Sequence, residues 1–339
     1  MSQFRVNEVA APTLSVVVPA HDAAGFIAET LESIAAQTRP PDRIVVVDDG
    51  SRDGTAGRVR AWAASCVAIP VLLIEQENRG VSAARNAGIR AAGTDLVALV
   101  DADDLILPDH LRTVTDVFGS HPEVVLAFAD ACQFEGAFAA AAGGAGDGGK
   151  VVKPSLLAGA PLLDRPAEAA GPGGVEIVLG SPFGSLLADN HIPTSAVVLR
   201  RDAALAAGLF DEAMPVAEDW DLWLRMALLG SFAYSRRVLA AKRIHGSNLT
   251  RPENVLRFLR ANLGMFRRLA ADDRIRRDPD MAGAVQAART RTARQMLWYG
   301  SLGGPRLYLG VCRDLAGERL FAPLCNPRHA ARAFIRAAG

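Results

Sequence analysis

The chain has 339 residues, of which half are hydrophobic, and it has 37 basic and 37 acidic residues. This length and composition predict a folded protein that buries a substantial core in one large domain or two smaller ones. A formal net charge of zero excludes a global field that would attract nucleic acid, so we expect no nucleic-acid partner.

No apolar segment reaches the roughly 18–20 residues that span a bilayer. The first residues do not show the charged and apolar regions of a secretory signal. The cysteines are scattered along the chain and form no CxxC pair. We therefore expect a reduced, cytoplasmic protein without disulfides or a zinc site.

Strands and helices are predicted to alternate from Leu14 to about Phe134. The predicted strands are Leu14–Pro19, Arg43–Val47, Val71–Ile74 and Leu96–Val100, and the predicted helices are Ile27–Ala36, 55–64 and Val81–Ala92. This order predicts an α/β fold in which a parallel sheet is connected by right-handed crossovers.

The pattern becomes weaker after this region. Residues 136–175 are rich in Ala, Gly and Pro and predict a flexible insertion. A strand at Ser195–Arg200 and an amphipathic helix at Asp219–Leu229 follow. Beyond about residue 250, helical spacing and arginine dominate. We expect one domain over residues 1–249 and a helical C-terminal region over residues 250–339.

Two apolar strands end abruptly at clustered carboxylates. Val45–Val47 runs into Asp48 and Asp49, and Leu99–Val100 runs into Asp101-Ala102-Asp103-Asp104. The carboxyl ends of parallel strands lie at the edge where open α/β sheets bind ligands. In an extended segment, Asp101 and Asp103 would project to one side and could hold a divalent metal that binds phosphate oxygens. Solvated turns with capping aspartates are the alternative at both places.

Three further segments contain residues that could take part in binding or catalysis. Residues 79–86 place two arginines at the start of a helix, where phosphates bind well, although a solvated helix face explains them equally. Residues 217–225 begin a helix with three carboxylates and two tryptophans, which suit a helix dipole or a pocket that removes a proton from a hydroxyl. His245 follows a predicted strand, and a structural role is the alternative to a place in the pocket.

Taken in order, these segments resemble the inverting glycosyltransferases of family 2, which have the GT-A fold. The matching stretches are SVVVPAHDAAGFIAETLESIAAQT, IVVVDDGSRDGT, ENRGVSAARNAGI, LVALVDADD, LFDEAMPVAEDWDLWLRMALLG and RIHGSN. They cover about residues 14–248, roughly two thirds of the chain. Each stretch is weak by itself, and the ordered series is specific.

The resemblance implies a site for the nucleotide of the donor. Pro19 and His21 lie on its first nucleotide-contacting loop, where the family often has Pro-x-Tyr-Asn, so His21 departs from the pattern and could alter base stacking. Asp49 looks like the residue that reads the base. Arg85 and Asp101 resemble nucleotide or phosphate contacts.

The resemblance also implies a metal and a catalytic base. Asp101 and Asp103 look like the family's DxD pair for Mg²⁺ or Mn²⁺, with Asp103 the direct ligand, and His245 is placed near the metal or diphosphate. Asp219 resembles the general base. Glu218 and Trp220 would shape the acceptor site.

The implied reaction moves a sugar from a nucleotide-diphospho-sugar to a hydroxyl of a saccharide or lipid-linked acceptor, in bacterial surface polysaccharide or glycolipid synthesis. Residues 305–339 mix arginines with apolar residues, which suits packing on the catalytic domain, a homodimer contact or a peripheral contact with the cytoplasmic face of a membrane.

Two other functions compete with this one. A sugar-nucleotide-forming nucleotidyltransferase would need a basic, glycine-rich loop after the first strand, and residues 19–25 contain no Lys or Arg. A non-catalytic sugar-nucleotide-binding or scaffold protein on the same fold is the other alternative. The presence of Asp49, Asp101, Asp103 and Asp219 argues against it.

Overall fold

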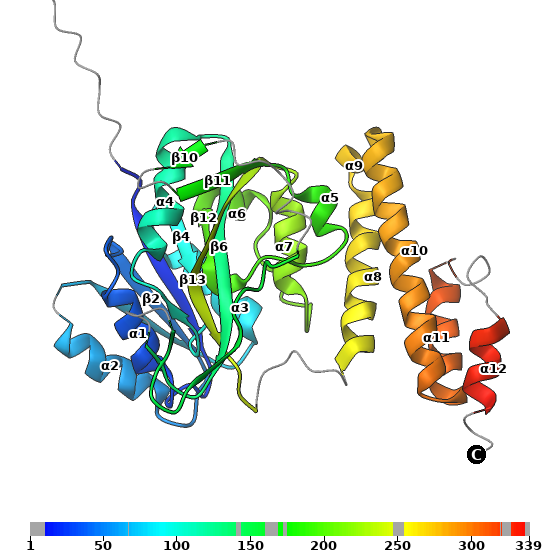
Figure 1. Cartoon of the computed structure of the whole chain (residues 1–339), viewed down its shortest axis with the longest axis horizontal. Helices are drawn as coiled ribbons and strands as arrows, with labels where there is room; N and C mark the ends of the chain where they lie inside the picture. The colour runs from blue at the N-terminus through cyan, green and yellow to red at the C-terminus, as the bar shows by residue number, and fades with distance from the viewer. Residues whose placement is uncertain are drawn as a thin grey trace, which may run out of the picture. The chain divides into compact units, whose positions relative to one another are not determined.

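The computed structural model describes residues 11–66, 68–139, 144–159, 169–171, 175–246, 254–318, 320 and 327–335. It divides into two compact units (Figure 1). The first unit comprises residues 1–186, 190–212 and 222–245, and the second comprises residues 187–189, 213–221 and 246–339.

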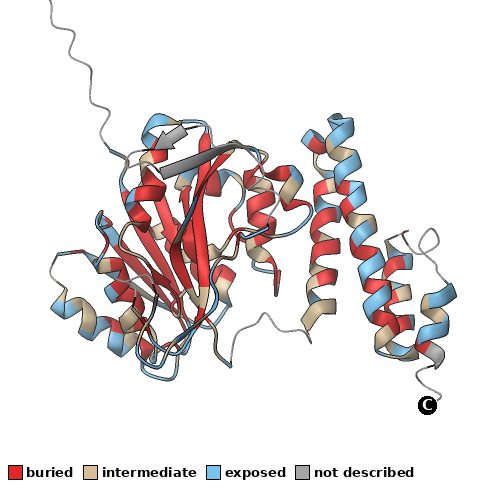
Figure 2. Cartoon of the chain, viewed as in Figure 1, coloured by how far each residue is buried: buried red, intermediate tan, exposed pale blue. Residues whose placement is uncertain are grey.

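Four parallel strands form one half of the sheet in the first unit. They are β1 (Leu14–Ala20), β2 (Arg43–Asp49), β3 (Val71–Gln76) and β4 (Leu96–Leu99), in the spatial order β4-β1-β2-β3. Every residue of β1 and β4 is buried, as the continuous apolar runs predicted for strands covered on both faces (Figure 2). β2 continues through Asp48 and Asp49, so both acids belong to the strand itself.

Helices cover both faces of this half. α1 (Ile27–Ala35), α2 (Thr55–Ser65) and α4 (His110–Ser120) contribute to one apolar core with Val16 and Val18. Because side chains alternate along a strand, Val17 points to the opposite face. There, α3 (Val81–Ala91) packs so closely that a Cβ on Gly88 would lie 2.3 Å from Val17 Cγ1. Only glycine permits this approach.

The other half of the sheet is mixed. β12 (Val197–Arg200) is antiparallel to both β4 and β6 (Val124–Glu135), and β13 (Ser231–Arg243) is parallel to β6. β5 (Leu105–Ile106) pairs with β13, which also pairs with β11 (Val175–Gly180), and β10 (Ala169–Gly171) follows β11. The prediction of an α/β fold with helices around a central sheet is confirmed. The series of adjacent parallel strands ends at β4, because its next neighbour β12 is antiparallel.

The segment that we expected to be a flexible insertion contains short strands among its described residues. β7 (Phe138–Ala139) pairs with β8 (Gly144–Ala145), and β9 (Lys150–Lys153) pairs with β6. The buried carboxylate of Asp130 holds the middle of this segment, because it accepts hydrogen bonds from Ser155 Oγ and from the N–H groups of Leu156 and Leu157.

Shorter helices connect the remaining strands. These are α5 (Phe183–Leu186), the 3₁₀ helix η3 (Thr194–Ala196), α6 (Arg201–Ala206) and α7 (Glu218–Met226). The boundary between the two units passes through α7, which places Trp223 in the core of the first unit and Trp220 in the second.

The second unit is helical, as expected for residues beyond 250. It contains α8 (Val255–Ala271), α9 (Asp273–Arg277), α10 (Pro279–Leu302), α11 (Pro305–Gly317) and α12 (Pro327–Ile335). Asp272 and Asp278 cap α9 and α10 through their side chains. Leu263, Leu297 and Val311 belong to its apolar core. Within the described ranges, no helix combines the length and apolar character needed to cross a membrane.

Candidate functional site

Asp49, at the end of β2, is buried and uses both carboxylate oxygens. Oδ1 accepts hydrogen bonds from Gln76 Nε2 (2.7 Å) and from the main-chain N–H of Arg79 (2.9 Å), and Oδ2 accepts one from the N–H of Gly80 (2.7 Å). A carboxylate has about four acceptor positions. The described residues use three of them, so Oδ2 retains one for a ligand.

His21 lies directly beside Asp49, just beyond β1. Its Nδ1 is 2.9 Å from the carbonyl oxygen of Asp49, and its Nε2 is 3.1 Å from Asn78 Nδ2. Gly50 has φ +73°, and a Cβ there would lie 2.8 Å from the main-chain nitrogen of Asn78. This turn therefore requires glycine. Pro19 is a buried residue of β1, in register with Val47 of β2.

Residues 101–104 form a turn, and our expectation of an extended segment is wrong. The N–H of Asp104 donates to the carbonyl of Asp101 at 3.0 Å. The hydroxyl of Ser195 closes the turn, because it accepts from the N–H of Asp101 (3.1 Å) and donates to Asp104 Oδ2 (2.6 Å). As a result, Asp101 and Asp103 have different partners.

Asp101 is held by Arg85 of α3. Arg85 Nη2 donates to Asp101 Oδ1 at 2.7 Å, and the arginine side chain is only 5% exposed. Its guanidinium lies over the ring of Phe210, 5.3 Å from the centroid, and Asn86 binds both the N–H and the carbonyl of Phe210. Since the residues that bind Asp49 immediately precede α3, this helix connects both acid clusters.

Asp103 contacts His245, which follows β13. His245 Nε2 is 2.7 Å from Asp103 Oδ2, and the two side chains are 22% and 28% exposed. The ring of Phe26 stacks on the imidazole with centroids 5.0 Å apart. The pair is thus oriented by an aromatic neighbour and remains accessible to a ligand.

Asp104 is the buried member of the acidic turn. Its Oδ1 accepts from the main-chain N–H of Arg243 at 2.9 Å. Burial, together with the nearby carboxylates of Asp103 and Asp101, raises the pKa of Asp104 to about 7. Near neutral pH this carboxyl is therefore partly protonated, which reduces the negative charge of the turn.

The carboxylate oxygens of residues 101–104 suit a hard divalent cation that also binds a phosphate ligand. Among the described residues, no three His, Cys, Asp or Glu side chains gather into a cluster that could hold a metal. Mg²⁺ commonly takes only one or two protein carboxylates and completes its shell with water and substrate phosphates. The partly exposed Asp103 carboxylate, with His245 beside it, fits this pattern.

The predicted base and acceptor residues lie in the part of α7 that belongs to the second unit. Glu218, Asp219 and Asp221 are in the first turn of α7. Asp219 Oδ1 accepts from the N–H of Trp220 at 2.6 Å. Asp221 is buried and pairs with Arg268 of α8 at 2.8 Å. Asp219 and Asp221 thus have different environments.

Sequence reasoning missed several residues of this site. Gln76 and Ser195 bind the acidic side chains, and Phe26 orients His245. Arg243 and Asp104 lie in the stretches RIHGSN and LVALVDADD, but the resemblance to the family gave them no role. No local signal identifies these residues, because their partners are distant in the sequence.

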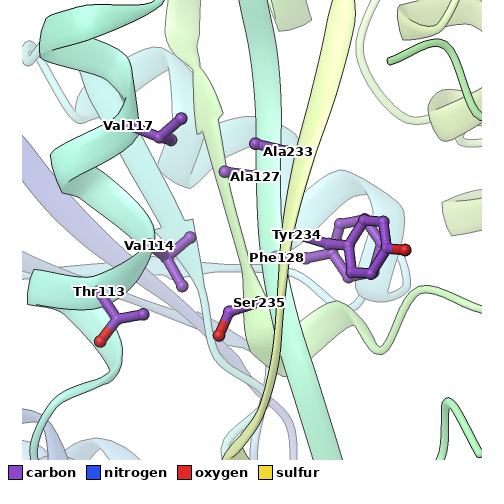
Figure 3. Close-up of a pocket in the computed structure, with 8 residues that line it drawn as sticks. All are labelled: Thr113, Val114, Val117, Ala127, Phe128, Ala233, Tyr234 and Ser235. Atoms are coloured by element: carbon purple, nitrogen blue, oxygen red, sulfur yellow. The ribbon is translucent and has the colours of Figure 1, made fainter. Parts of the chain in front are cut away.

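A small pocket lies away from these residues, between α4 and strands β6 and β13 (Figure 3). Its lining is mostly apolar, with the side-chain hydroxyls of Thr113 and Ser235 on the α4 side of the strands, whereas the rings of Phe128 and Tyr234 point away from α4. None of the predicted site residues lines it, and it contains no carboxylate.

Comparisons with known proteins find glycosyltransferases. Residues 15–143 match the family described as Glycosyl transferase family 2. The chain is 33% identical over 115 residues to the putative glycosyltransferase EpsH of Bacillus subtilis, a match that covers 34% of this chain and 33% of EpsH. It is 26% identical over 239 residues to the amylovoran biosynthesis glycosyltransferase AmsE of Erwinia amylovora, covering 70% of this chain and 78% of AmsE.

A solved structure has the same fold. The mannosyltransferase PcManGT of Pyrobaculum calidifontis, in complex with GDP-Man and Mn²⁺, superposes with a TM-score of 0.57 at 19% identity, covering 95% of this chain and 79% of PcManGT. With the sheet order, the acidic strand ends and the match over residues 15–143, these findings agree with the predicted family. Residues 15–143 are thus similar to glycosyl transferase family 2, and the chain shares the GT-A fold of the solved glycosyltransferase structure.

Proposed function

We propose that this protein is an inverting glycosyltransferase that uses a nucleotide-diphospho-sugar and Mg²⁺ or Mn²⁺. The observation that carries the proposal is the pair of acidic sites that α3 connects: the Asp49 carboxylate, held by the residues just before this helix, and Asp101, held by Arg85. Relatives named for polysaccharide biosynthesis support a role in making a bacterial surface polysaccharide or glycolipid.

Asp49 is the proposed contact of the nucleotide base. Its remaining acceptor position on Oδ2 can take an N–H of the base, while three protein donors hold the carboxylate in place. His21, which contacts the Asp49 carbonyl, and Pro19 are proposed to border the same nucleotide. Arg85 and Asp101 are proposed to lie at the phosphates, where the buried guanidinium orients the carboxylate.

Asp103 is the proposed metal ligand, with Asp101 and His245 beside it. When bound, the cation would neutralise charge that develops on the leaving diphosphate. The contribution of this chain's residues is to hold the carboxylate: His245 contacts its Oδ2, and Phe26 keeps the imidazole in place.

Asp219 is the proposed general base. An acceptor hydroxyl oxygen attacks the anomeric carbon as the bond from that carbon to the diphosphate oxygen breaks, and the configuration inverts. The Asp219 carboxylate takes the hydroxyl proton, and the nucleoside diphosphate leaves with the bonding electron pair. Glu218 and Trp220 are proposed to shape the acceptor site.

The deciding experiment incubates the full chain with a panel of nucleotide sugars, with Mn²⁺ and with EDTA. Release of nucleoside diphosphate, through transfer or slow donor hydrolysis, supports the proposal if it requires the metal. Metal-dependent thermal stabilisation by a nucleotide sugar without any turnover supports the non-catalytic alternative instead. Absence of both effects with every donor rejects the nucleotide-sugar site.

A peripheral contact with the cytoplasmic face of a membrane, through residues 305–339, is proposed for a lipid-linked acceptor. α11 exposes Arg306, Leu309 and Arg313, spaced three and four residues apart on one side, and buries Tyr308 and Val311 on the other. Leu309 is 56% exposed. Arginine beside exposed apolar residues suits anionic lipid headgroups.

Flotation with vesicles tests this contact. The full chain should float with vesicles that contain phosphatidylglycerol and not with pure phosphatidylcholine, and the double variant Arg306→Glu, Arg313→Glu should lose flotation. Arg277→Glu in α9 is the matched control and should float normally. Failure of the unmodified chain to float, with a dimer in light scattering that Leu309→Asp dissociates, would assign the face to a second copy.

A further inference from the structure

Arg243, the last residue of β13, is a buried arginine whose donors all point at the acidic turn and its surroundings. Arg243 as a whole is 7% exposed. The main-chain N–H donates to Asp104 Oδ1 (2.9 Å), and Nε donates to the carbonyl of Asp103 (3.1 Å). Nη1 donates to the carbonyl of Gly136 (2.9 Å), and Nη2 pairs with Glu29 of α1. One side chain thus joins β13, α1, the end of β6 and residues 101–104.

Two aromatic rings fix the plane of this guanidinium. Its central carbon lies 4.6 Å from the ring centroid of Phe134 and 5.2 Å from that of Phe26. The same Phe26 ring stacks on His245, whose Nε2 contacts Asp103. Arg243 therefore touches the main chain of Asp103 directly and the partner of its side chain through Phe26.

We propose that Arg243 is the positioning residue of the metal site, which sets the Asp103 carboxylate and the His245 imidazole at the geometry that the cation requires. This inference rests on the proposed use of a divalent metal. A planar guanidinium holds two carbonyls and a carboxylate along fixed donor directions, whereas a lysine ammonium presents its donors from a single atom at the end of a flexible stem. Groups that orient metal ligands commonly change metal affinity about 10–100-fold when they are replaced.

The chain provides a matched control for a merely structural arginine. Arg200 lies over the ring of Phe118 at 5.2 Å and donates to the carbonyls of Val124 (2.8 Å) and Phe118 (3.0 Å). It therefore has the same kind of aromatic and carbonyl environment in the same unit. None of its contacts with other described residues involves the acidic turn, so its replacement reports on folding alone.

The test compares Arg243→Lys with Arg200→Lys in the full chain. Free Mn²⁺ is measured by electron paramagnetic resonance in the presence of saturating UDP or GDP, and thermal unfolding is followed in parallel. Arg243→Lys should weaken Mn²⁺ binding about 10–100-fold. Arg200→Lys should bind Mn²⁺ as the unmodified chain does, at a similar loss of Tm.

The outcomes separate this inference from the proposed function. Absence of Mn²⁺ binding by the unmodified chain with either nucleotide rejects the metal site itself. Normal binding by the unmodified chain and by Arg243→Lys rejects the positioning role. If Arg243→Lys does not fold, Phe26→Leu replaces it, because it removes the ring between Arg243 and His245 and keeps the guanidinium hydrogen bonds. Unchanged Mn²⁺ affinity in that variant overturns the inference.

Discussion

His245 Nε2 lies 2.7 Å from Asp103 Oδ2, although 142 positions separate the two residues in the chain. The contact joins the end of the parallel half of the sheet to the end of β13. It brings a carboxylate oxygen and an imidazole nitrogen, two kinds of atom that bind divalent metals in proteins, to one partly exposed place.

Replacement of this pair should separate metal binding from nucleotide binding. Asp103→Ala is expected to abolish metal-dependent binding of a nucleoside diphosphate, because it removes the proposed ligand, and His245→Ala should weaken the Mn²⁺ affinity about 10–100-fold. Calorimetry with and without Mn²⁺ measures both effects. Asp109→Asn, a carboxylate that pairs with Arg112 outside the site, is the control. Retained metal dependence in Asp103→Ala would falsify the ligand assignment.

Asp219 and Asp221 offer a comparison of two carboxylates in one helical turn. Asp219→Asn should lower turnover about 10²–10⁴-fold, the usual contribution of a general base, and should leave donor binding intact. Asp221→Asn should instead lower Tm, because it breaks the pair with Arg268. It should retain most of the turnover. Initial rates at saturating donor, with a donor Kd for each variant, distinguish the two. Equal rates in both variants would exclude Asp219 as the base.

Asp49→Asn tests the nucleotide contact. An amide cannot accept with both ends, so one donor among Gln76, Arg79 and Gly80 loses its partner, and the free energy of unfolding should fall by about 1–3 kcal/mol. Nucleotide affinity should fall as well, because the acceptor for the base is lost or displaced. Urea unfolding and calorimetry measure the two effects. Unchanged nucleotide affinity in a folded Asp49→Asn variant would show that this carboxylate does not bind the base.

The buried His110 makes stability depend on pH. Both of its ring nitrogens are buried without a hydrogen-bond partner among the described residues, and burial lowers the pKa of His110 to about 3. Below the unfolded pKa of about 6.5, the unfolded chain binds a proton that the folded chain excludes, so stability falls by up to roughly 1.4 kcal/mol per pH unit.

His110→Leu should remove this loss, so the stability difference between variant and unmodified chain should grow as the pH falls from 7 to 5. Asp104, with its raised pKa, contributes the opposite slope in both proteins, and the difference cancels it. Urea unfolding at several pH values gives the result. A difference that does not change with pH would show that His110 is protonated in the folded state.

The strands and helices of the parallel half of the sheet were predictable, because their patterns are local. Val16–Val18 and Val45–Val47 are continuous apolar runs, which report burial on both faces. Ile27, Leu31 and Ile34 have helical spacing. The same reasoning could not show that β12 would insert antiparallel beside β4, since strand order depends on pairing between distant segments.

The sequence by itself determined where the acids occur: at the ends of buried strands and at the start of a helix. The tertiary structure alone decided what each acid contacts. Asp49 is held by N–H groups that immediately precede α3, Asp101 by Arg85, and Asp103 by His245. Local patterns record burial and backbone preference, whereas hydrogen bonds between side chains distant in sequence exist only once the sheet has brought its strand ends together.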